Sequence, residues 1–442
     1  MVNGTGKAPT GSAGFLAGLR VLELSAGLAG NVPHHETNLR FLAVNAGKRS
    51  LVLDPDSERD QERLGALTAN ADVLIEEPSP KKRHDWRLSA GALESHYPAL
   101  VHAYISPYGR EGPYRDYVAD ELTIYALSGL MYHIGSYDKE PLRHGADQAP
   151  CLAGINAAAG VLLALLNRDR DGAGQCVDVS MQECLAVLLG SLELSQYAYT
   201  GGVARRGAKD GPGLNGIIAC ADGYAVPIAF GAPWCWVTIA VAGDAQWQAL
   251  CREMAQADLG REQRFVTEKG RKIHEDELNR IVNSWTSGLD RFEVMRRLQA
   301  TGIAAGAVQT TRDLFFDDQL DTRGFFEQVD HRPRDPELGV RPYVGRGWRL
   351  SRTPGFIQGP APGLGEHNAS VLQGLLGVPP ENLARLQAQG VTGDAPAEGT
   401  AAPATTPPEE RIAQGRWASW DPQFEWLLGL APSVGLPLAK EN

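Results

Sequence analysis

The first part of the chain alternates short apolar runs with longer stretches of helical periodicity. A helical pattern over residues 57–71 separates two of these runs. Strand-length runs divided by helices are typical of βαβ units, which build a parallel sheet. The sequence therefore predicts an α/β fold with strands at 19–24 (LRVLEL), 50–54 (SLVLD), 72–76 (DVLIE) and 100–106 (LVHAYIS).

The next part is more apolar and richer in small side chains. Residues 122–130 and 151–167 repeat apolar positions at helical spacing, which is typical of tightly packed buried helices. The longest apolar run, 154–166, contains Asn156 and is shorter than a membrane span, so we expect no membrane segment. A turn then leads to a strand at 176–180 (CVDVS), which runs directly into a helix from Met181.

The middle of the chain has a different pattern and predicts a smaller inserted domain. A glycine-rich loop over 201–216 precedes a hairpin pattern over 217–229 whose turn is Asp222-Gly223. Helical patterns follow over 245–300, and then a strand over 304–309. We expect a large domain made of 1–205 and 323–391, a small domain at 206–322, a flexible linker at 392–410 and an aromatic tail at 411–442.

Composition narrows the class of protein. The 442 residues carry 42 Lys and Arg against 53 Asp and Glu, a net charge of −11, which argues against nucleic-acid binding. The six cysteines form no CxxC pair and no zinc-spaced cluster, so we expect buried thiols in a cytoplasmic protein without a metal. The N-terminus has no apolar core of a signal peptide.

Four short motifs allow chemical interpretations. Gly211–Gly216 matches GxGxxG, but a hairpin pattern follows it, so we interpret it as a turn. His34-His35 is interpreted as a loop rather than a metal site. Ser180–Glu183 fits a capping box, and it also fits a carboxylate nucleophile in the first turn of a helix. The cations of Asn45–Ser50 form either a solvated strand edge or contacts to a phosphate-bearing ligand.

In their order along the chain, many segments resemble the class III CoA-transferases, a family that includes formyl-CoA and carnitine CoA-transferases and α-methylacyl-CoA racemases. The similarity covers about 18–391. It rests on GLRVLELSAGLAG (18–30), NAGKRSLVLD (45–54), ADVLIEEPSP (71–80), LVHAYISPYGREGPYRDYVADEL (100–122), ALSGLM (126–131), LLALLNRDRDGAGQCVDVSMQE (162–183), CADGYAVPIA (220–229), LQATGIAAGAVQT (298–310), RGFFEQVDH (323–331) and RLSRTPGFIQGPAPGLGEHN (349–368).

This resemblance implies a Rossmann-like large domain, a smaller α/β domain and an interlocked dimer. It implies coenzyme A and acyl-CoA as substrates, without a permanently bound cofactor. In the family an active-site aspartate attacks the thioester, giving a mixed anhydride and a CoA thiolate. The thiolate then forms an enzyme-bound thioester, which the acceptor carboxylate resolves. Asn45, Lys48 and Arg49 are the implied ligand contacts.

Three departures from the family pattern bear on activity. The family's aspartate aligns with Glu183, whose extra methylene displaces the carboxylate by about an ångström. Residues 31–44 are too few for the helix and strand that family members carry around the CoA nucleotide, so the large domain is expected to be truncated there. Asp120 aligns with the histidine of the racemases, which argues against epimerisation.

The leading hypothesis is therefore a companion subunit of a hetero-oligomeric CoA-transferase that uses a donor such as succinyl-CoA, similar to benzylsuccinate CoA-transferase. A homologous partner would carry the intact nucleotide site and the catalytic aspartate. A second hypothesis is an active homodimer in which Glu183 is the nucleophile. A third, of a different class, is a non-catalytic scaffold or regulator that binds acyl-CoA. The aromatic tail is expected to dock a partner.

Overall fold

The structure of the chain is a computed structural model. It divides into a first unit (Met1–Val118, Ala153–Val179 and Arg312–Asn442) and a second unit (Ala119–Leu152 and Ser180–Thr311). The residues described are 16, 18–25, 39–54, 56–77, 90–135, 139–145, 147–190, 193–203, 224–230, 235–336, 338–388, 392, 406–415, 417, 419–428 and 430. His34-His35, the Gly211–Gly216 motif and the Asp222-Gly223 turn lie outside these residues.

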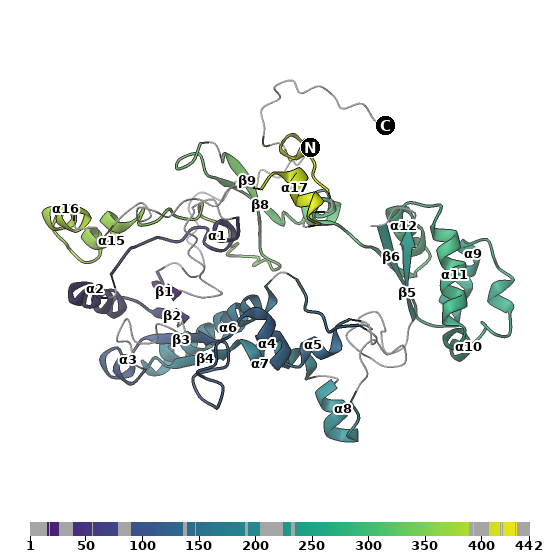
Figure 1. Cartoon of the computed structure of the whole chain (residues 1–442), viewed down its shortest axis with the longest axis horizontal. Helices are drawn as coiled ribbons and strands as arrows, with labels where there is room; N and C mark the ends of the chain where they lie inside the picture. The colour runs from purple at the N-terminus through teal and green to yellow at the C-terminus, as the bar shows by residue number, and fades with distance from the viewer. Residues whose placement is uncertain are drawn as a thin grey trace. The chain divides into compact units, whose positions relative to one another are not determined.

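The first unit is built on a four-stranded sheet in the order β1-β2-β3-β4, in which β1, β2 and β3 are parallel neighbours (Figure 1). Its strands are β1 (Val21–Ser25), β2 (Val73–Glu77), β3 (Val101–Ser106) and β4 (Cys176–Ser180). Its helices in the same part of the chain are α1 (Leu39–Val44), α2 (Glu58–Ala69), α3 (Ala90–His96) and most of α6 (Gln148–Asp171). The predicted α/β fold with a parallel sheet is confirmed.

Apolar side chains leave the two faces of this sheet alternately, because successive residues of a strand point to opposite faces. On one face, Val73 and Val101 pack against Ala164 and Leu165 of α6. On the opposite face, Leu74 and Leu100 form a cluster with Leu93, Tyr97 and other apolar residues. Both faces are therefore covered, as the near-continuous apolar strand sequences predict.

The strand predicted at 50–54 is wrong, because the structure gives this apolar run no regular secondary structure. Its backbone N–H groups instead form hydrogen bonds with side chains from the C-terminal part of the first unit. The Ser50 N–H donates to His367 Nδ1 at 3.2 Å, and the Val52 N–H donates to Asn368 Oδ1 at 2.9 Å. A run of apolar residues predicts that its side chains are buried. Which groups accept hydrogen bonds from its backbone N–H groups depends on the segment that packs beside it in the folded chain.

Helix α6 is longer than the apolar run 154–166 indicates, because it extends into polar residues at both ends. It has 24 residues, and by length and composition alone it is a helix of the described residues long and apolar enough to cross a membrane, a test that helices in a protein core also pass. One face of it belongs to the core of the first unit. Gly160 is needed there, since a Cβ at this position would lie 2.6 Å from Val177 Cγ1.

The rest of the first unit comes from the C-terminal part of the chain. A two-stranded antiparallel sheet pairs β8 (Phe326–Asp330) with β9 (Val340–Val344). The helices are α13 (Thr311–Phe315, from Arg312 on), α14 (Asp318–Thr322), α15 (Asn368–Gly374), α16 (Pro380–Ala388), α17 (Pro408–Ala413) and α18 (Phe424–Leu427). Arg312 Nε donates to Asp421 Oδ2 at 3.2 Å, which ties the tail to α13.

The second unit has its own antiparallel sheet in the order β5-β6-β7, with β5 (Tyr224–Phe230), β6 (Cys235–Val241) and β7 (Ala304–Ala307). Helix α11 packs against β5, and α12 packs against β6 and β7 (Figure 1). Its core includes Ile239, Trp247, Leu250, Phe265 and Leu298, which are almost fully buried.

The helices of the second unit are α4 (Glu121–Leu127), α5 (Leu130–His133), α7 (Met181–Ala186), α8 (Glu193–Thr200), α9 (Asp244–Glu253), α10 (Glu268–Ile273), α11 (Glu275–Thr286) and α12 (Arg291–Ala300), with short 3-10 turns η1 (Val187–Leu189) and η3 (Leu259–Arg261). The two units and the predicted domain boundaries divide the chain differently, and those boundaries stay a prediction.

Candidate active site

Glu183 lies in the first turn of α7, directly after strand β4. Ser180 is the N-cap of this helix, and its Oγ accepts a hydrogen bond from the Glu183 N–H at 3.3 Å. One half of the capping box is therefore present. The carboxylate itself is on an exposed residue, and within the described residues no hydrogen bond to it is found. A cap that uses the backbone of Glu183 leaves its carboxylate open to a substrate.

The neighbours of Glu183 on α7 anchor the helix. Met181 and Leu185 are fully buried, so the helix turns the polar side chain of residue 183 outward. Gln182 Nε2 donates to the Leu127 carbonyl at 2.8 Å, which joins α7 to the end of α4. Burial raises the pKa of the Cys184 thiol, and the charge of Glu183 raises it further. Cys184 is therefore a neutral thiol beside the candidate nucleophile.

Asp120, which the sequence resemblance aligns with the histidine of the racemases, is the N-cap of α4. Its Oδ1 accepts from the Thr123 N–H at 2.8 Å, and the Thr123 hydroxyl completes the capping box. The bond from the Thr123 amide lowers the pKa of Asp120, with a second contribution from the Thr123 side chain. A carboxylate held ionised by a helix start is a poor base for removing a carbon-bound proton.

Asn45, Lys48 and Arg49 follow helix α1 in the first unit. Lys48 Nζ donates to Asn45 Oδ1 at 2.9 Å and forms an ion pair with Glu23 of β1. Asn45 Nδ2 donates to the Phe41 carbonyl at 3.1 Å, which fixes the amide at the end of the helix. The structure therefore brings Asn45 and Lys48 together. Arg49 is exposed, and no ion pair of its side chain is found among the described residues.

The segment that carries these residues is docked on the C-terminal part of the first unit. Gly47 has a φ of +74°, and its N–H donates to the Pro360 carbonyl at 3.0 Å. The Gly365 N–H donates to Ser50 Oγ at 3.0 Å. Hydrogen bonds from the Ser50 and Val52 N–H groups to the side chains of His367 and Asn368 complete this joint between residues 47–52 and 360–368.

The sequence contains both halves of this joint among its family-like segments, but it does not show that they touch. The only signal was the polar pair His367-Asn368 at the end of a glycine- and proline-rich segment. Glu183 belongs to the second unit, and Asn45, Lys48 and Arg49 belong to the first. Among the described residues there is no group of three or more His, Cys, Asp or Glu side chains placed to hold a metal ion.

Solved structures share this α/β architecture. A CAIB/BAIF family protein from Brucella suis matches 82% of this chain and 100% of its own, with a TM-score of 0.72 and 24% identity. A hypothetical protein from Mycobacterium tuberculosis matches 81% of this chain and 98% of its own, with a TM-score of 0.64 and 22% identity. These likenesses define the class of fold.

The family follows from the sequence comparisons. The model of CoA-transferase family III matches residues 28–368, so the chain belongs to CoA-transferase family III. The formyl-CoA:oxalate CoA-transferase of Streptomyces coelicolor is 31% identical over 367 residues, which are 80% of this chain and 86% of the relative. The succinyl-CoA–D-citramalate CoA-transferase of Chloroflexus aurantiacus is 29% identical over 346 residues, 78% and 82% of the two chains. The resemblance stated from the sequence is confirmed.

Proposed function

We propose that this chain is the companion subunit of a CoA-transferase that moves CoA from succinyl-CoA to a carboxylic acid, and that a homologous partner carries the catalytic aspartate. The proposal rests on Glu183, which the sequence resemblance aligns with the family's aspartate. Attack on a thioester carbon needs the carboxylate oxygen within a few tenths of an ångström of its productive place. A longer side chain on the same backbone moves it by about an ångström, which can cost about a hundredfold in rate.

Relatives of this chain support a split between subunits. Two proteins of Chloroflexus aurantiacus are the alpha and beta subunits of a succinyl-CoA–L-malate CoA-transferase, at 28% and 29% identity over 81% and 80% of this chain. Each of them is similar to this chain over most of its length, and their names describe two kinds of subunit of one CoA-transferase. Their donor, by name, is succinyl-CoA, and we adopt it as the donor here.

Exposed apolar side chains in both units support a partner chain. In α6, Ile155 is 66% exposed and Leu163 is 68% exposed. In the second unit, Val187 and Tyr197 are 69% and 61% exposed. Large apolar side chains exposed on each unit are suited to being covered by a partner chain. They fit the interlocked dimer that the family resemblance implies.

Asn45, Lys48 and Arg49 are proposed to contact the phosphates of CoA. The exposed guanidinium of Arg49 is suited to two parallel hydrogen bonds with a phosphate. Lys48 is held by Asn45 and Glu23, so its ammonium has a fixed position but is already partly neutralised. Arg49 therefore supplies the larger part of the proposed attraction.

The aromatic tail is proposed as a second element of assembly. Trp417, Trp420 and Phe424 are 38–44% exposed. Within the first unit, the Arg312–Asp421 ion pair joins the tail to α13. Removing the chain after residue 391 is expected to weaken assembly with the partner, as measured by the mass of the complex in solution. An unchanged mass would remove the tail from the proposal.

A second candidate is an active homodimer that uses Glu183 as its nucleophile. The exposed carboxylate favours it, because no hydrogen bond from the described residues competes with a substrate for this group. The same covalent relay would pass through a glutamyl anhydride and a glutamyl thioester of CoA, with the donor acid leaving between the two.

The deciding experiment is to purify the chain alone and together with its homologous partner, and to assay CoA transfer from succinyl-CoA. The proposal expects turnover only from the assembled pair. Glu183→Gln should then change its kcat by less than about twofold, since the reacting carboxylate is elsewhere. Glu183→Asp is the matched control, because it restores the family's side chain.

Hydroxylamine gives an independent readout, because it cleaves acyl anhydrides and thioesters and marks the carboxyl group that carried them. Label on an aspartate of the partner supports the companion role. Label on Glu183, with turnover by this chain alone and loss of at least about a thousandfold in Glu183→Gln, establishes the homodimer instead. Binding of acyl-CoA without turnover by either preparation would indicate the non-catalytic scaffold.

A further inference from the structure

A second group of reactive side chains lies on the sheet of the first unit, on the face that carries α3. Cys176 begins β4, His102 is on β3 and Glu76 is on β2. The pairing of β2 with β3 sets Glu76 opposite Tyr104, two residues from His102, so both side chains leave the same face. The order β2-β3-β4 places His102 between the carboxylate and the thiol.

Contacts within this group are direct. His102 Nε2 lies 2.9 Å from Glu76 Oε2, and His102 Nδ1 lies 4.0 Å from Cys176 Sγ. Arg110 Nη1 donates to the same sulfur at 2.9 Å. Arg110 is itself held, since its N–H donates to Asp178 at 3.1 Å and its guanidinium lies over the Tyr104 ring. The sulfur therefore faces a histidine on one side and a fixed cation on the other.

Gly174 lets the chain reach this position. Its N–H donates to the Pro98 carbonyl at 2.7 Å, and the His102 N–H donates to the Gln175 carbonyl at 3.0 Å. A Cβ at residue 174 would lie 2.0 Å from the Leu100 carbonyl oxygen, which no side chain tolerates. A glycine at residue 174 is therefore needed for the two backbones to come close enough to place Cys176 beside His102.

The neighbours of His102 favour its protonated form. Burial by itself would lower the pKa of His102, but the hydrogen bonds to Cys176 and Glu76 raise it to about 9. Among the described residues, the charged groups that face the cluster are Glu76 from β2, Arg110 from the loop after β3, Asp178 from β4 and Glu94 from α3. An imidazolium and a guanidinium beside one sulfur stabilise a thiolate.

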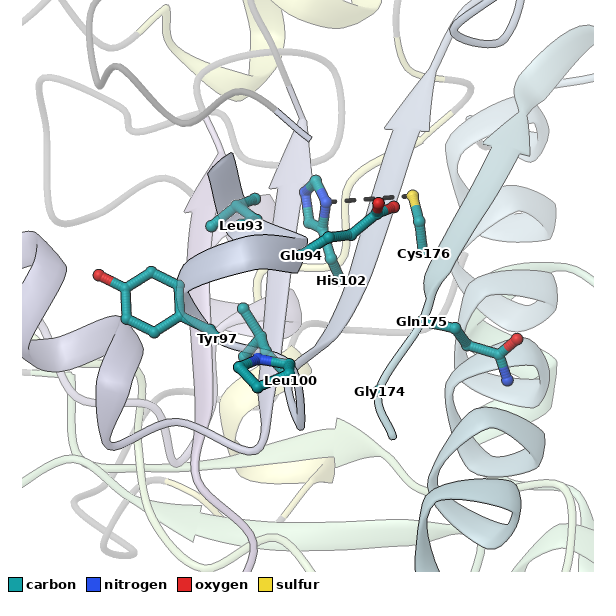
Figure 2. Close-up of a pocket in the computed structure, with 9 residues that line it drawn as sticks. Leu93, Glu94, Tyr97, Leu100, His102, Gly174, Gln175 and Cys176 are labelled. Atoms are coloured by element: carbon teal, nitrogen blue, oxygen red, sulfur yellow. Dashed lines mark hydrogen bonds between the residues drawn. The ribbon is translucent and has the colours of Figure 1, made fainter. Parts of the chain in front are cut away.

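A small cavity of about 90 Å³ opens beside the sulfur. Figure 2 shows His102 and Cys176 joined by their contact, with Leu93, Glu94 and Tyr97 of the α3 region also among the side chains that line the cavity. Glu94, Pro98 and Gln175 are exposed residues of its lining, so solvent reaches it. Drug-sized ligands take pockets of roughly 300–1,000 Å³, so this cavity admits only a small reactant.

We propose that Cys176 is a thiolate site for oxidation by a small peroxide, independent of CoA transfer. The sulfur attacks one oxygen of the peroxide and the O–O bond breaks. For hydrogen peroxide, the products are a Cys176 sulfenic acid and hydroxide, which takes the proton of the His102 imidazolium and leaves as water. The sulfur is oxidised, the peroxide is reduced, and His102 ends neutral.

Competition inside the full-length chain tests this directly. Cys151 in α6 is an exposed free cysteine, so it serves as the matched control thiol. The chain is treated with less than one equivalent of hydrogen peroxide at about pH 7. Dimedone then traps any sulfenic acid, and mass spectrometry locates the label. This pH is chosen because an ordinary thiol is only a few per cent thiolate there. We expect dimedone on Cys176 at least about tenfold faster than on Cys151. Equal labelling, or faster labelling of Cys151, would overturn the proposal.

Variants then show whether the neighbours are responsible. Cys176→Ser must remove the label, and Arg110→Lys, which retains a cation, should keep most of it. His102→Gln should slow labelling of Cys176 by about tenfold while leaving Cys151 unchanged. Normal labelling of Cys176 in His102→Gln contradicts the assignment.

A measurement on the unaltered chain covers the case in which His102→Gln does not fold. Alkylation by iodoacetamide at about pH 7 should be at least about tenfold faster at Cys176 than at the exposed Cys151, because a histidine and an arginine contact the Cys176 sulfur. Equal alkylation rates at the two cysteines also overturn the proposal.

Discussion

Glu183 and Cys176 are seven residues apart on one continuous strand and helix, and both are candidate nucleophiles, but their surroundings are opposite. Glu183 is exposed, and its link to the fold is its own backbone N–H, which Ser180 caps. Cys176 is half-buried, and a histidine and an arginine contact its sulfur. A carboxylate needs no local activation to be ionised at neutral pH, whereas a thiol does.

The difference shows what each site still requires. Within the described part of the chain, no donor is hydrogen-bonded to the Glu183 carboxylate, so this part of the chain supplies the ionised group without a preformed contact to it. The surroundings that make Cys176 reactive are already built by three neighbouring strands and one loop. The Cys176 site can therefore be tested in this chain alone, whereas the Glu183 site is tested in the assembled protein.

The largest effect is expected from Gly174→Ala, which removes the close approach that Cys176 depends on. The new Cβ would meet the Leu100 carbonyl oxygen at 2.0 Å, so β3 and the segment before β4 must separate. We expect a loss of about 3 kcal/mol in the free energy of unfolding, measured with urea. Gly154→Ala in α6 is the control, because nothing lies within 4 Å of its Cβ; it should not destabilise. Equal stability of both variants would contradict the close approach.

The next effect is a pH dependence that belongs to the thiol site. The pKa of His102 is about 9 in the folded chain, above its ordinary value of 6.5, so protonation favours the folded state. This stabilisation is complete below about pH 6.5 and is lost as the pH rises through about 9. The free energy of unfolding should therefore fall by about 3 kcal/mol more in the natural chain than in His102→Gln over this range. Identical pH profiles would remove the imidazolium from the site.

A smaller effect tests whether this chain binds CoA. Glu183 can act as a nucleophile only if an acyl-CoA is bound. Arg49→Ala should weaken CoA binding to the assembled protein by about tenfold, because one charge-assisted contact to phosphate is lost. The readout is isothermal titration calorimetry at two salt concentrations, since the contribution of Arg49 should shrink with salt. Arg59→Ala on α2 is the control, because Arg59 is an equally exposed arginine of the first unit. If both variants bind equally well, Arg49 is not a ligand contact.

The smallest effect concerns the helix start under Glu183. Ser180→Ala removes the cap and should cost about 1 kcal/mol in the free energy of unfolding. Asp120→Ala removes the cap of α4 at a similar cost and is therefore a matched control. If Glu183 is the nucleophile, only the Ser180 variant should also lower kcat. A fall in kcat for both would indicate general loosening.

Strands could be predicted where apolar residues are continuous and both faces of the sheet are covered, as in β2 and β3. The prediction failed at 50–54, where the same kind of run bonds to His367 and Asn368. The cause is physical: periodicity reports which side chains are buried, and says nothing about which distant backbone satisfies their N–H groups. The length of α6 was likewise underestimated, because polar residues at its ends hid the continuation of the helix.

By itself the sequence determined the α/β class, the family and the position of Glu183, since these depend on local patterns and on segment order. It also placed Asn45, Lys48 and Arg49 on one short segment. Only the tertiary structure decided that this segment docks on 360–368, and that Cys176 meets His102 and Arg110. Those contacts join residues 66 to 317 positions apart. No motif can encode such a meeting, because it is set by strand order and by the one glycine that allows the backbones to touch.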